Sequence, residues 1–312
     1  MPMTQLTIVV DCNDPQYSEE ICAAFALFPQ VKAVLPEDPA AREAQCACCW
    51  FPDPQLLARS PQLKLIQAAS AGVDHLPASV FASDVPLCRV VDEDFRHGMF
   101  EYALWGVLWF QRRFDRALAH QRERVWKMYP QRAAADYHVG VMGLGEIGGY
   151  IASQLAGLGY RVSGWARSEK ALTDVRCYHG EAQAGEFLGQ LDALINVLPL
   201  TEQTRGILAH PLLQQLPDGA ALINCGRGEH MVNRDVLEAL DSGKLSSALL
   251  DVFPVEPLPQ QDPLWQHPQV VITPHMASIA QTEVIARQLL DNIQRLRQAL
   301  PLKNLVNKQS GY

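Results

Sequence analysis

Three titratable residues in the second half of the chain have the side-chain types needed to move a proton and to bind a carboxylate. An imidazole such as that of His275 can donate or accept a proton near neutral pH. A nearby carboxylate such as Glu256 orients the ring and raises its pKa, and a guanidinium such as Arg227 binds a substrate carboxylate. Taken singly, each also has a structural interpretation: an ion pair, an exposed loop acid, and a capped or core histidine. Together they favour a catalytic site.

Each of these residues lies in a loop that follows a predicted strand. The loops are Cys225–His230, after a strand that ends at Asn224, then Asp251–Pro257 and Thr273–Ser278. In open α/β sheets the carboxyl ends of the strands line the crevice that receives the ligand. We therefore expect the three loops to converge.

A glycine pattern in mid-chain predicts a dinucleotide site. Gly143 allows a tight turn after a β-branched strand, Gly145 lets the backbone approach a pyrophosphate, and Gly148 lets a helix pack on the strand. The helix expected over Ile147–Leu158, preceded by Glu146, presents N–H groups to the phosphates. Because the pattern lies near the middle of the chain, a further domain is expected before it.

The residues after the next strand favour NADP over NAD as the cofactor. An NAD-binding fold usually has Asp or Glu about 20 residues past the glycines, where it binds the ribose 2′-OH. Here that position holds Ala166, and Arg167, Ser168 and Lys170 follow. A guanidinium can bind a 2′-phosphate that a carboxylate would repel. The alternative is that Arg167 is a solvated loop residue whose charge Glu169 offsets.

Short apolar runs alternate with helical segments along the chain, which is typical of parallel sheets covered on both faces. Before residue 97 the predicted strands are Leu6–Val10, Val31–Leu35, Cys46–Phe51, Leu63–Ala68 and Leu87–Val91. From the glycine pattern onward they are His138–Met142, Tyr160–Trp165, Ala193–Val197, Ala220–Asn224, Ala248–Val252 and Val270–Thr273. The pattern predicts an α/β fold with two doubly wound parallel-sheet domains (Rossmann or flavodoxin-like) and a cleft between them. We expect residues 1–97 and 286–312 to form one domain and residues 98–285 to form the other.

A long helix is expected over residues 98–123. It carries one apolar stripe at helical spacing, while Trp105 and Trp109 lie on a different side. A helix with tryptophans outside its main stripe buries a second face against another domain or another subunit. A plain interdomain helix is an equal alternative on this pattern alone.

The bulk properties indicate a globular two-domain protein. At 312 residues the chain exceeds the usual size of a single core, and 26 basic against 34 acidic residues give a net charge of −8. An acidic balance argues against nucleic acid as the main partner. The first residues lack a basic region, and the most apolar stretch, Ala103–Phe110, is too short for a bilayer. A cytoplasmic protein with no membrane contact is expected.

The eight cysteines are too sparse for a disulfide scaffold in a chain of this length. Cys46, Cys48 and Cys49 form the one cluster, but no second cysteine pair or histidine pair accompanies it as a zinc site would require. Alternation along a strand points Cys46 and Cys48 to one face and Cys49 to the other. We expect a buried strand of small apolar residues and no metal.

The order of motifs resembles that of the D-2-hydroxyacid dehydrogenase family over nearly the whole chain. Beside the glycine pattern, the matching segments are Ala71–Asp74, Glu101–Ala103, Trp109–Phe110, Arg112–Asp115, Leu216–Ala220, Gly226–Gly228, Leu250–Phe253, Glu256–Pro259, Pro263–Pro268, Thr273–His275 and Gly311–Tyr312. Within the family, the chain closely resembles the bacterial enzymes that reduce glyoxylate and hydroxypyruvate. It implies NADPH-dependent reduction of glyoxylate to glycolate and of hydroxypyruvate to D-glycerate, with NAD as a weaker cofactor.

The resemblance also implies roles for individual residues. His275 would protonate the carbonyl oxygen of a small 2-oxoacid, with Glu256 as its partner, and Arg227 would bind the 2-oxoacid and polarise its carbonyl. Asp251 would hold the nicotinamide side of the cofactor. The other residues implied at the cofactor are Leu198, Pro199, Thr204, Cys225 and Gly226.

Further residues are implied at the substrate. Backbone N–H groups around Ala71 and Gly72 would bind the substrate carboxylate, and Trp50 would lie near that pocket. The family dimerises through the long helix and the arm after it, so a homodimer is expected, with Trp126 reaching the active site of the partner subunit. Ser70 stands where many relatives have Gly, which could alter the loop or the substrate preference.

Other functions stay open at this point. A D-lactate or D-phosphoglycerate dehydrogenase is disfavoured by the expected NADP preference, and the latter also by the lack of a regulatory domain. A non-catalytic dinucleotide sensor like the family's corepressors is disfavoured by the retention of all three catalytic residues. Cys225 replaces a more usual Ala or Ser, either as an oxidation-sensitive thiol or as a small buried residue.

Overall fold

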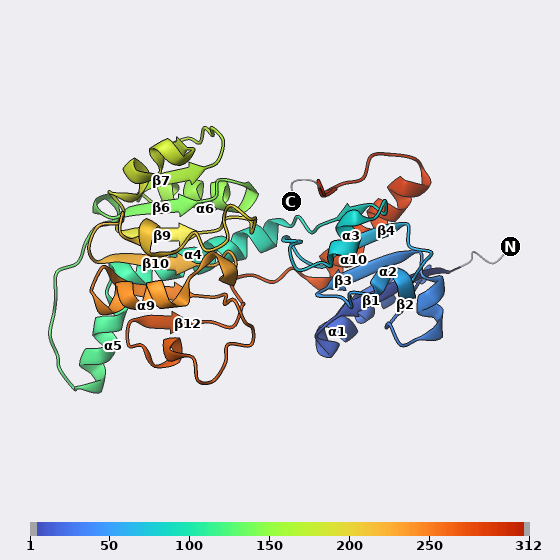
Figure 1. The fold of residues 1–312 in the computed structure, drawn as a ribbon, viewed down its shortest axis with the longest axis horizontal. Coiled ribbons are helices and arrows are strands. Elements are labelled where there is room, and N and C mark those ends of the chain that lie inside the picture. Colours follow the sequence, from blue (N-terminus) through green and yellow to red (C-terminus); the bar gives the residue numbers. More distant parts are fainter. Residues whose placement is uncertain (1–4, 309–312) are drawn as a thin grey trace. The chain divides into compact units, whose positions relative to one another are not determined.

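The computed structural model describes residues 5–308 and divides into two compact units (Figure 1). Unit 1 comprises Met1–Phe95 and Ile279–Tyr312, and unit 2 comprises Arg96–Ser278. The return to unit 1 therefore comes seven residues earlier than the expected boundary at 285/286. The terminal motif Gly311–Tyr312 lies outside the described residues.

Within residues 5–308, unit 1 contains a five-stranded parallel sheet in the order β2-β1-β3-β4-β5. This is the flavodoxin-like order, whose switch point lies between β1 and β3. The strands are β1 (Leu6–Cys12), β2 (Val31–Val34), β3 (Cys46–Trp50), β4 (Leu65–Ala68) and β5 (Leu87–Cys88).

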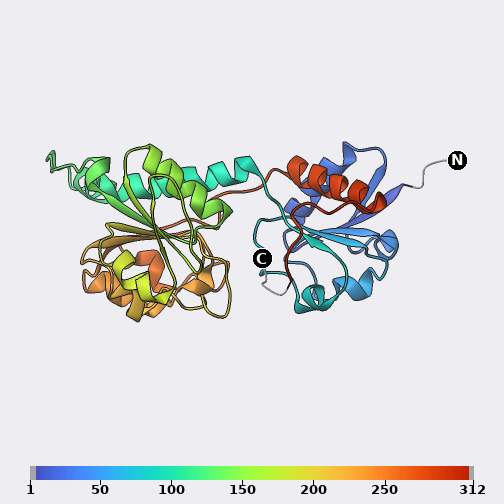
Figure 2. The ribbon, with the colours of Figure 1, turned by 90° about the horizontal axis from the view of Figure 1, so that it is seen from above.

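Helices cover both faces of this sheet (Figure 2). They are α1 (Pro15–Ala26), the 3-10 helix η1 (Pro39–Glu43), α2 (Leu56–Arg59), α3 (Ala78–Ala82) and α10 (Thr282–Arg297). Cys46 and Cys48 pack on the face of α1 and α10, whereas Cys49 packs on the opposite face. The alternation predicted for these cysteines is confirmed.

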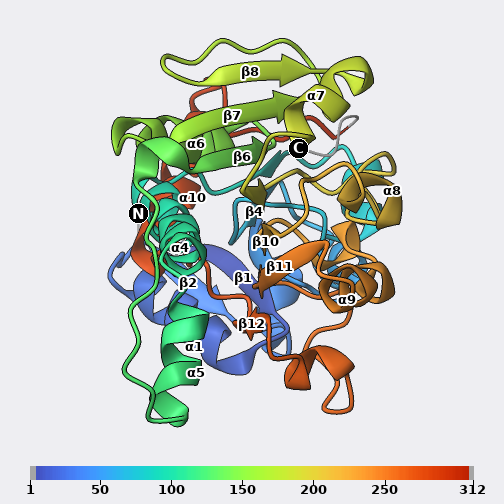
Figure 3. The same cartoon turned by 90° about the vertical axis from the view of Figure 1, so that its left-hand side faces the viewer.

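Within the same described range, unit 2 contains a seven-stranded parallel sheet in the order β12-β11-β10-β9-β6-β7-β8 (Figure 3). Its strands are β6 (His138–Met142), β7 (Arg161–Ala166), β8 (Arg176–His179), β9 (Ala193–Asn196), β10 (Ala220–Asn224), β11 (Leu245–Leu250) and β12 (Val270–Ile272). The switch point lies between β6 and β9, the first and fourth strands of this unit. The predicted α/β fold with two doubly wound parallel sheets is confirmed. Strand β8 was missed because it is a short polar segment at the edge of the sheet.

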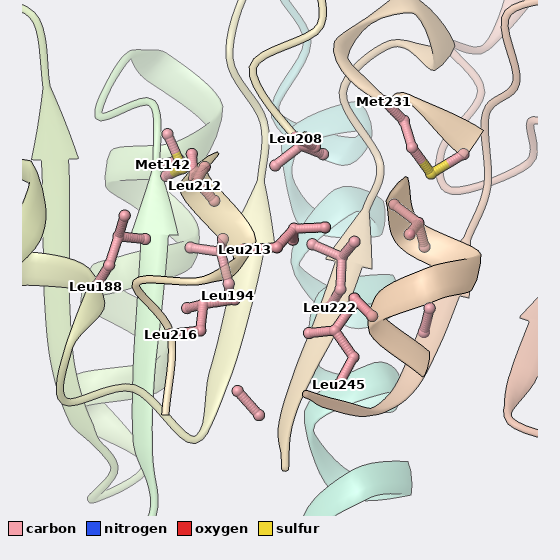
Figure 4. Close-up of a cluster of buried hydrophobic side chains, with 14 of the residues drawn as sticks. Met142, Leu188, Leu194, Leu208, Leu212, Leu213, Leu216, Leu222, Met231 and Leu245 are labelled. Atoms are coloured by element: carbon pink, nitrogen blue, oxygen red, sulfur yellow. The ribbon is translucent and has the colours of Figure 1, made fainter. Parts of the chain in front are cut away.

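The helices of unit 2 also lie on both faces of its sheet (Figure 2). They are α4 (Glu93–Gln111, which begins in unit 1), α5 (Phe114–Arg122), η2 (Ala134–Asp136), α6 (Glu146–Gly157), η3 (Glu181–Gln183), α7 (Ala184–Leu188), α8 (His210–Leu213), η4 (Gly228–His230), α9 (Asn233–Asp241) and η5 (Pro263–Gln266). Leucines of α7, α8 and α9 interdigitate with Leu194 and Leu222 of the central strands in one buried cluster (Figure 4). On the opposite face α4 lies so close that a Cβ at Gly106 would touch Ile223 and Leu249.

The single helix expected over residues 98–123 is a wrong prediction. The structure has two helices, α4 and α5, separated at Arg113, whose φ of 52° is left-handed and ends the right-handed helix. The Arg113 carbonyl accepts the N–H of Ala117 in α5, and the Tyr129 hydroxyl lies within hydrogen-bond distance of the carbonyls of both Arg112 (3.3 Å) and Arg113 (2.9 Å) at the break. No residue of α5 is buried in the chain.

In the part of the chain that the structure describes, no helix is both long enough and apolar enough to span a bilayer. The same residues contain no group of three His, Cys, Asp or Glu side chains that could hold a metal ion.

Candidate active site

A histidine–carboxylate pair lies at the carboxyl ends of β11 and β12. The Nδ1 atom of His275 is 2.8 Å from Oε2 of Glu256, and the two side chains are 35% and 34% exposed. The other carboxylate oxygen, Oε1, accepts the backbone N–H of Phe253 at 2.8 Å. Because an ionised carboxylate only accepts hydrogen bonds, Nδ1 carries the proton and Nε2 is the ring nitrogen left to act on a substrate.

Glu256 is held in its charged form. Burial alone would raise the pKa of this carboxyl group, but hydrogen bonds from His275 and Phe253 oppose that effect. The positive charges of His275 and Arg227 add to them, and the net result is a pKa below the ordinary value. His275 contacts Glu256 directly, and Gly228, next to Arg227, lies against the backbone of Phe253, so the three loops that carry the sequence-predicted residues lie together.

Asp251 fixes the loop that carries His275. The backbone of His275 has a left-handed φ of 51°, which is unfavourable for a residue with a Cβ. Its N–H donates to the carbonyl of Asp251 at 2.8 Å, and the buried carboxylate of Asp251 accepts the N–H groups of Met276 (2.9 Å) and Ala277 (3.0 Å). The hydroxyl of Thr273 donates to the same carboxylate at 2.6 Å. Asp251 therefore acts on the loop from both sides of the histidine.

The loop with Arg227 contacts the Glu256 loop through glycine. A Cβ on Gly228 would overlap the backbone of Phe253, so only glycine allows this approach. The Nη1 atom of Arg227 donates to the carbonyl of Gly226 at 2.8 Å, one of the contacts of its guanidinium. Cys225 is buried at the start of the loop, and burial raises the pKa of its thiol. This favours the interpretation of Cys225 as a small buried residue.

The turn between β6 and α6 has the shape that a dinucleotide pyrophosphate requires. Gly143 has a φ of +103°, and a Cβ on Gly148 would overlap the carbonyl oxygen of Gly143. Gly145 caps the helix, and a Cβ there would meet no atom within 4 Å, so the backbone is open to a ligand. These features fit a phosphate group beside the free N–H groups of α6.

Two other residues predicted at the cofactor form the start of α6. The carboxylate of Glu146 pairs with Arg96 of α4 at 2.6 Å, so its charge next to the phosphate site is balanced. Arg96 also lies over the ring of Tyr150 in the next turn, 4.5 Å from its centroid. Ile147 follows Glu146 in the first turn of the helix.

The predicted cofactor residues after β9 lie in a hydrogen-bonded loop. Leu198 is buried, and its N–H donates to Oδ1 of Asn196 at 3.4 Å. The hydroxyl of Thr204 donates to the carbonyl of Pro199 at 2.7 Å and accepts the N–H of Thr201 at 2.8 Å. Thr204 therefore shapes the loop through its side chain.

The residues expected to choose between NADP and NAD follow the end of β7. Ala166 is its last residue and is buried, and Arg167, Ser168 and Lys170 are exposed after it. Ala166 pairs in register with His179 at the end of β8. Within the described residues, β7 is the second strand of unit 2 along the chain. It thus ends without a carboxylate and is followed by two exposed cations, Arg167 and Lys170.

The predicted substrate residues of unit 1 lie at the end of β3 and in the loop after β4. The hydroxyl of Ser70 donates to the carbonyl of Gly72 at 2.8 Å, and Arg89 donates to the carbonyl of Ala71 at 3.4 Å. Ser70 therefore stabilises the loop through a bond that glycine could not make. Trp50 ends β3 and makes edge-on contacts with the rings of Tyr17 and Phe51.

Trp126 lies in the segment after α5 and is 99% exposed in the chain. Its neighbour Met128 is 91% exposed. On α4, Trp105 contacts Trp109, which in turn contacts Phe114 at the start of α5, with ring centroids about 6 Å apart. The tryptophan side of α4 thus continues as an apolar surface onto α5.

Four polar side chains around the site were not predicted from the sequence. Tyr102 of α4 contacts the hydroxyl of Thr273 at 2.7 Å and so extends the Asp251 contacts. Asn196, Asn224 and His230 form a buried network beneath the arginine loop. The two asparagines each end an apolar strand, and this shared position was the available signal.

Comparisons with known proteins find relatives that are similar in sequence and in structure. Residues 104–277 match the family model described as D-isomer specific 2-hydroxyacid dehydrogenase, NAD binding domain. The chain is 38% identical over 277 residues to glyoxylate/hydroxypyruvate reductase A of Klebsiella pneumoniae subsp. pneumoniae, covering 87% of this chain and 88% of that protein.

Two solved structures are similar over almost their full length. A D-isomer specific 2-hydroxyacid dehydrogenase family protein from Klebsiella pneumoniae 342 is 73% identical, with a TM-score of 0.96 and coverage of 99% of both chains. The NADPH-dependent glyoxylate/hydroxypyruvate reductase of Sinorhizobium meliloti, in complex with NADP and sulfate, is 36% identical with a TM-score of 0.91. That match covers 99% of this chain and 100% of the other.

Proposed function

Because the chain belongs to the D-isomer-specific 2-hydroxyacid dehydrogenase family, we propose that it reduces glyoxylate to glycolate and hydroxypyruvate to D-glycerate with NADPH. The observation that carries this proposal is the 2.8 Å contact between His275 and Glu256 in the same unit as the glycine turn. A proton donor and a dinucleotide site are the two parts that carbonyl reduction requires. The names of the similar reductases support the choice of substrates.

The glycine turn would hold the cofactor. Gly143, Gly145 and Gly148 leave room for its pyrophosphate, and Arg167 and Lys170 supply cations for a 2′-phosphate. When bound, NADPH supplies the hydride. NADP in the similar Sinorhizobium meliloti structure supports the preference for the phosphorylated cofactor.

His275 would act as the general acid. Glu256 accepts a hydrogen bond from Nδ1–H of His275. The other N–H of the charged ring, at Nε2, would therefore donate its proton to the carbonyl oxygen of the 2-oxoacid. The negative charge of Glu256 stabilises the charged ring before that transfer. Asp251 keeps the ring in place through the loop backbone, in addition to its proposed position on the nicotinamide side.

Arg227 would bind the substrate and polarise its carbonyl group. A guanidinium suits this role because it donates two parallel hydrogen bonds to a planar anion. We assign the backbone N–H groups of Ser70–Gly72 to the substrate carboxylate and Trp50 to the wall of the pocket. The cleft between the two domains that these assignments require stays a prediction.

A homodimer is the proposed assembly. Trp105 and Phe114 are 38% and 44% exposed on the outer side of α4 and α5, and Trp126 is almost wholly exposed. Contiguous apolar surface of this kind is typical of an interface between subunits. Trp126 would then contact the active site of the partner subunit.

A panel of small 2-oxoacids, followed by NADPH absorbance, tests the proposal. Glyoxylate and hydroxypyruvate should be reduced with the highest kcat/KM, and pyruvate and phosphohydroxypyruvate much more slowly. Replacing His275 with Ala should lower kcat by about 10²–10⁴-fold, while NADPH binding followed by fluorescence is retained. Arg227→Ala should lower kcat and raise KM together.

Two results would count against this function. Reduction of pyruvate in preference to glyoxylate would indicate a D-lactate dehydrogenase. NADPH binding without reduction of any 2-oxoacid would indicate a dinucleotide sensor. Near-normal turnover in the His275→Ala variant would show that the acid is another residue.

A further inference from the structure

A buried polar network lies under the two loops to which we assign substrate and cofactor binding. Its members are Asn196 at the end of β9, Asn224 at the end of β10, and His230 in η4, all fully buried. Asn196 and Asn224 are register partners on neighbouring strands, and Nδ2 of Asn196 donates to Oδ1 of Asn224 at 2.9 Å. Burying polar side chains costs free energy of folding unless their hydrogen bonds are made, so we expect this bonded network to have a role in the site.

The hydrogen bonds determine which nitrogen of His230 carries the proton. The backbone N–H of Arg227 points to Nδ1 at 3.1 Å, and a backbone N–H can only donate. Nδ2 of Asn196 lies 2.9 Å from the same Nδ1 atom. The orientation of that amide is set because its Oδ1 faces the N–H of Leu198. The two donors share the single lone pair of Nδ1, so Nδ1 is the unprotonated nitrogen and Nε2 carries the hydrogen.

The Nε2–H group of His230 donates to a second loop. Its acceptor is the carbonyl of Pro199 at 3.3 Å, in the Leu198–Pro199 segment assigned to the cofactor. One imidazole ring thus bonds the backbone of the arginine loop with one nitrogen and the backbone of the cofactor loop with the other.

The asparagines complete the connection to Arg227. Nδ2 of Asn224 donates to the carbonyl of Arg227 at 3.2 Å, and its Oδ1 accepts the N–H of Gly226 at 3.3 Å. Both backbone polar groups of Arg227 are therefore bonded to the network. A Cβ at Gly226 would lie 2.9 Å from Nδ2 of Asn196 and 3.1 Å from Nδ1 of His230, so the loop sits directly against these atoms.

We propose that His230 is a positioning residue, which fixes the backbone of Arg227 and the carbonyl of Pro199 in one rigid arrangement. Substrate and cofactor are then presented to each other by loops that cannot shift independently. This inference rests on the proposed function, which assigns the Arg227 loop to the substrate and the Leu198–Pro199 loop to the cofactor. The ring itself contacts neither reactant in this role.

Two conservative variants separate the two halves of the connection. In His230→Asn, Oδ1 replaces Nδ1 as the acceptor for Arg227, but no group reaches Pro199. In His230→Gln, the longer amide can donate to the Pro199 carbonyl, but no acceptor remains at the Nδ1 position. His230→Leu removes both bonds. His138→Asn is the matched control, because His138 is also buried in this sheet but starts β6, at the opposite end of the strands.

The measurements are KM and kcat for glyoxylate, the Kd for NADPH from fluorescence without substrate, and the thermal unfolding of each variant. One lost buried hydrogen bond corresponds to about a tenfold effect. His230→Asn should keep KM for glyoxylate within about threefold of the wild type and raise the Kd for NADPH about tenfold. His230→Gln should show the reverse pattern, with kcat/KM for glyoxylate reduced about tenfold. His230→Leu should show both losses, and His138→Asn should show neither at a similar loss of thermal stability.

Equal effects of the Asn and Gln substitutions on both ligands would overturn the inference, as would a His230→Leu variant that behaves like the His138→Asn control. If the wild type reduces no 2-oxoacid, the proposed function fails, but the NADPH titrations still decide the Pro199 half. Nitrogen-15 NMR of histidine-labelled protein, assigned with the His230→Asn variant, tests the Arg227 half without activity. A protonated Nδ1 in the wild type would contradict the network.

Discussion

The side chain of Asp251 holds the backbone on both sides of His275. Its carboxylate binds the Thr273 hydroxyl before the histidine and two N–H groups after it, while its own carbonyl accepts the His275 N–H. The left-handed backbone of His275 costs about 1–2 kcal/mol, and these charge-assisted bonds offset that cost. The position of the imidazole is thus set by a residue that follows the neighbouring strand, β11.

Replacing Asp251 with Asn should disturb His275 without removing it. The amide NH₂ would face a backbone N–H, which leaves a buried donor unpaired and lowers the free energy of unfolding by about 1–3 kcal/mol. We expect kcat to fall by about tenfold or more, because a displaced imidazole is poorly aligned with the substrate carbonyl. Steady-state kinetics and denaturant unfolding measure the two effects. Asp262→Asn is the control, because Asp262 caps the helix η5 through one oxygen, which an amide can supply.

The Glu256 carboxyl group should contribute to acid sensitivity. Its pKa is lowered in the folded protein from an ordinary value of 4.5, so the ionised form stabilises the fold. That contribution is complete above the ordinary pKa and disappears as the pH falls through the lower folded pKa. Unfolding of the wild type and of Glu256→Gln, compared from about pH 5 to about pH 3, should show the wild type losing its advantage. A difference between the two that does not change over this range would contradict the lowered pKa.

Arg167 should decide the preference between the two cofactors. Replacing it with Asp removes a cation from the expected 2′-phosphate position and introduces repulsion. The ratio of kcat/KM for NADPH to that for NADH should fall by about 10–100-fold. Arg161→Asp is a matched control, because Arg161 is an exposed arginine at the opposite end of the same strand, β7. An unchanged ratio in Arg167→Asp would show that this side chain is only a solvated loop residue.

The buried cysteines should be chemically inert in the folded protein. Burial raises the pKa of Cys225, and it does the same for Cys48 and Cys49, so none is a thiolate near neutral pH. Iodoacetamide should leave these three unmodified in the native protein and should label all eight cysteines after denaturation. Peptide mass spectrometry gives the sites. Rapid native labelling of Cys225 would revive the interpretation as an oxidation-sensitive thiol.

Much of the fold could be predicted because buried parallel strands leave a strong local signal. β6 and β10 have the bounds that their apolar runs predicted. The break between α4 and α5 could not be predicted, because Arg113 has no local preference for a left-handed backbone. The break is stabilised by the hydroxyl of Tyr129, which donates to the carbonyl of Arg113 from 16 residues further along the chain. The edge strand β8 exists because β7 offers it a hydrogen-bonding partner, and its own polar sequence does not predict a strand.

The sequence by itself determined the chemistry that is available: a glycine turn, an arginine, an acid and a histidine, each after a strand of an α/β sheet. The family follows from these residues and their order. Only the tertiary structure decided how they are held. Asp251 controls the His275 backbone, and His230 bonds both the Arg227 loop and the Pro199 carbonyl, through contacts that span up to 31 positions in the chain. Such contacts depend on strand order and register, which local sequence patterns do not encode.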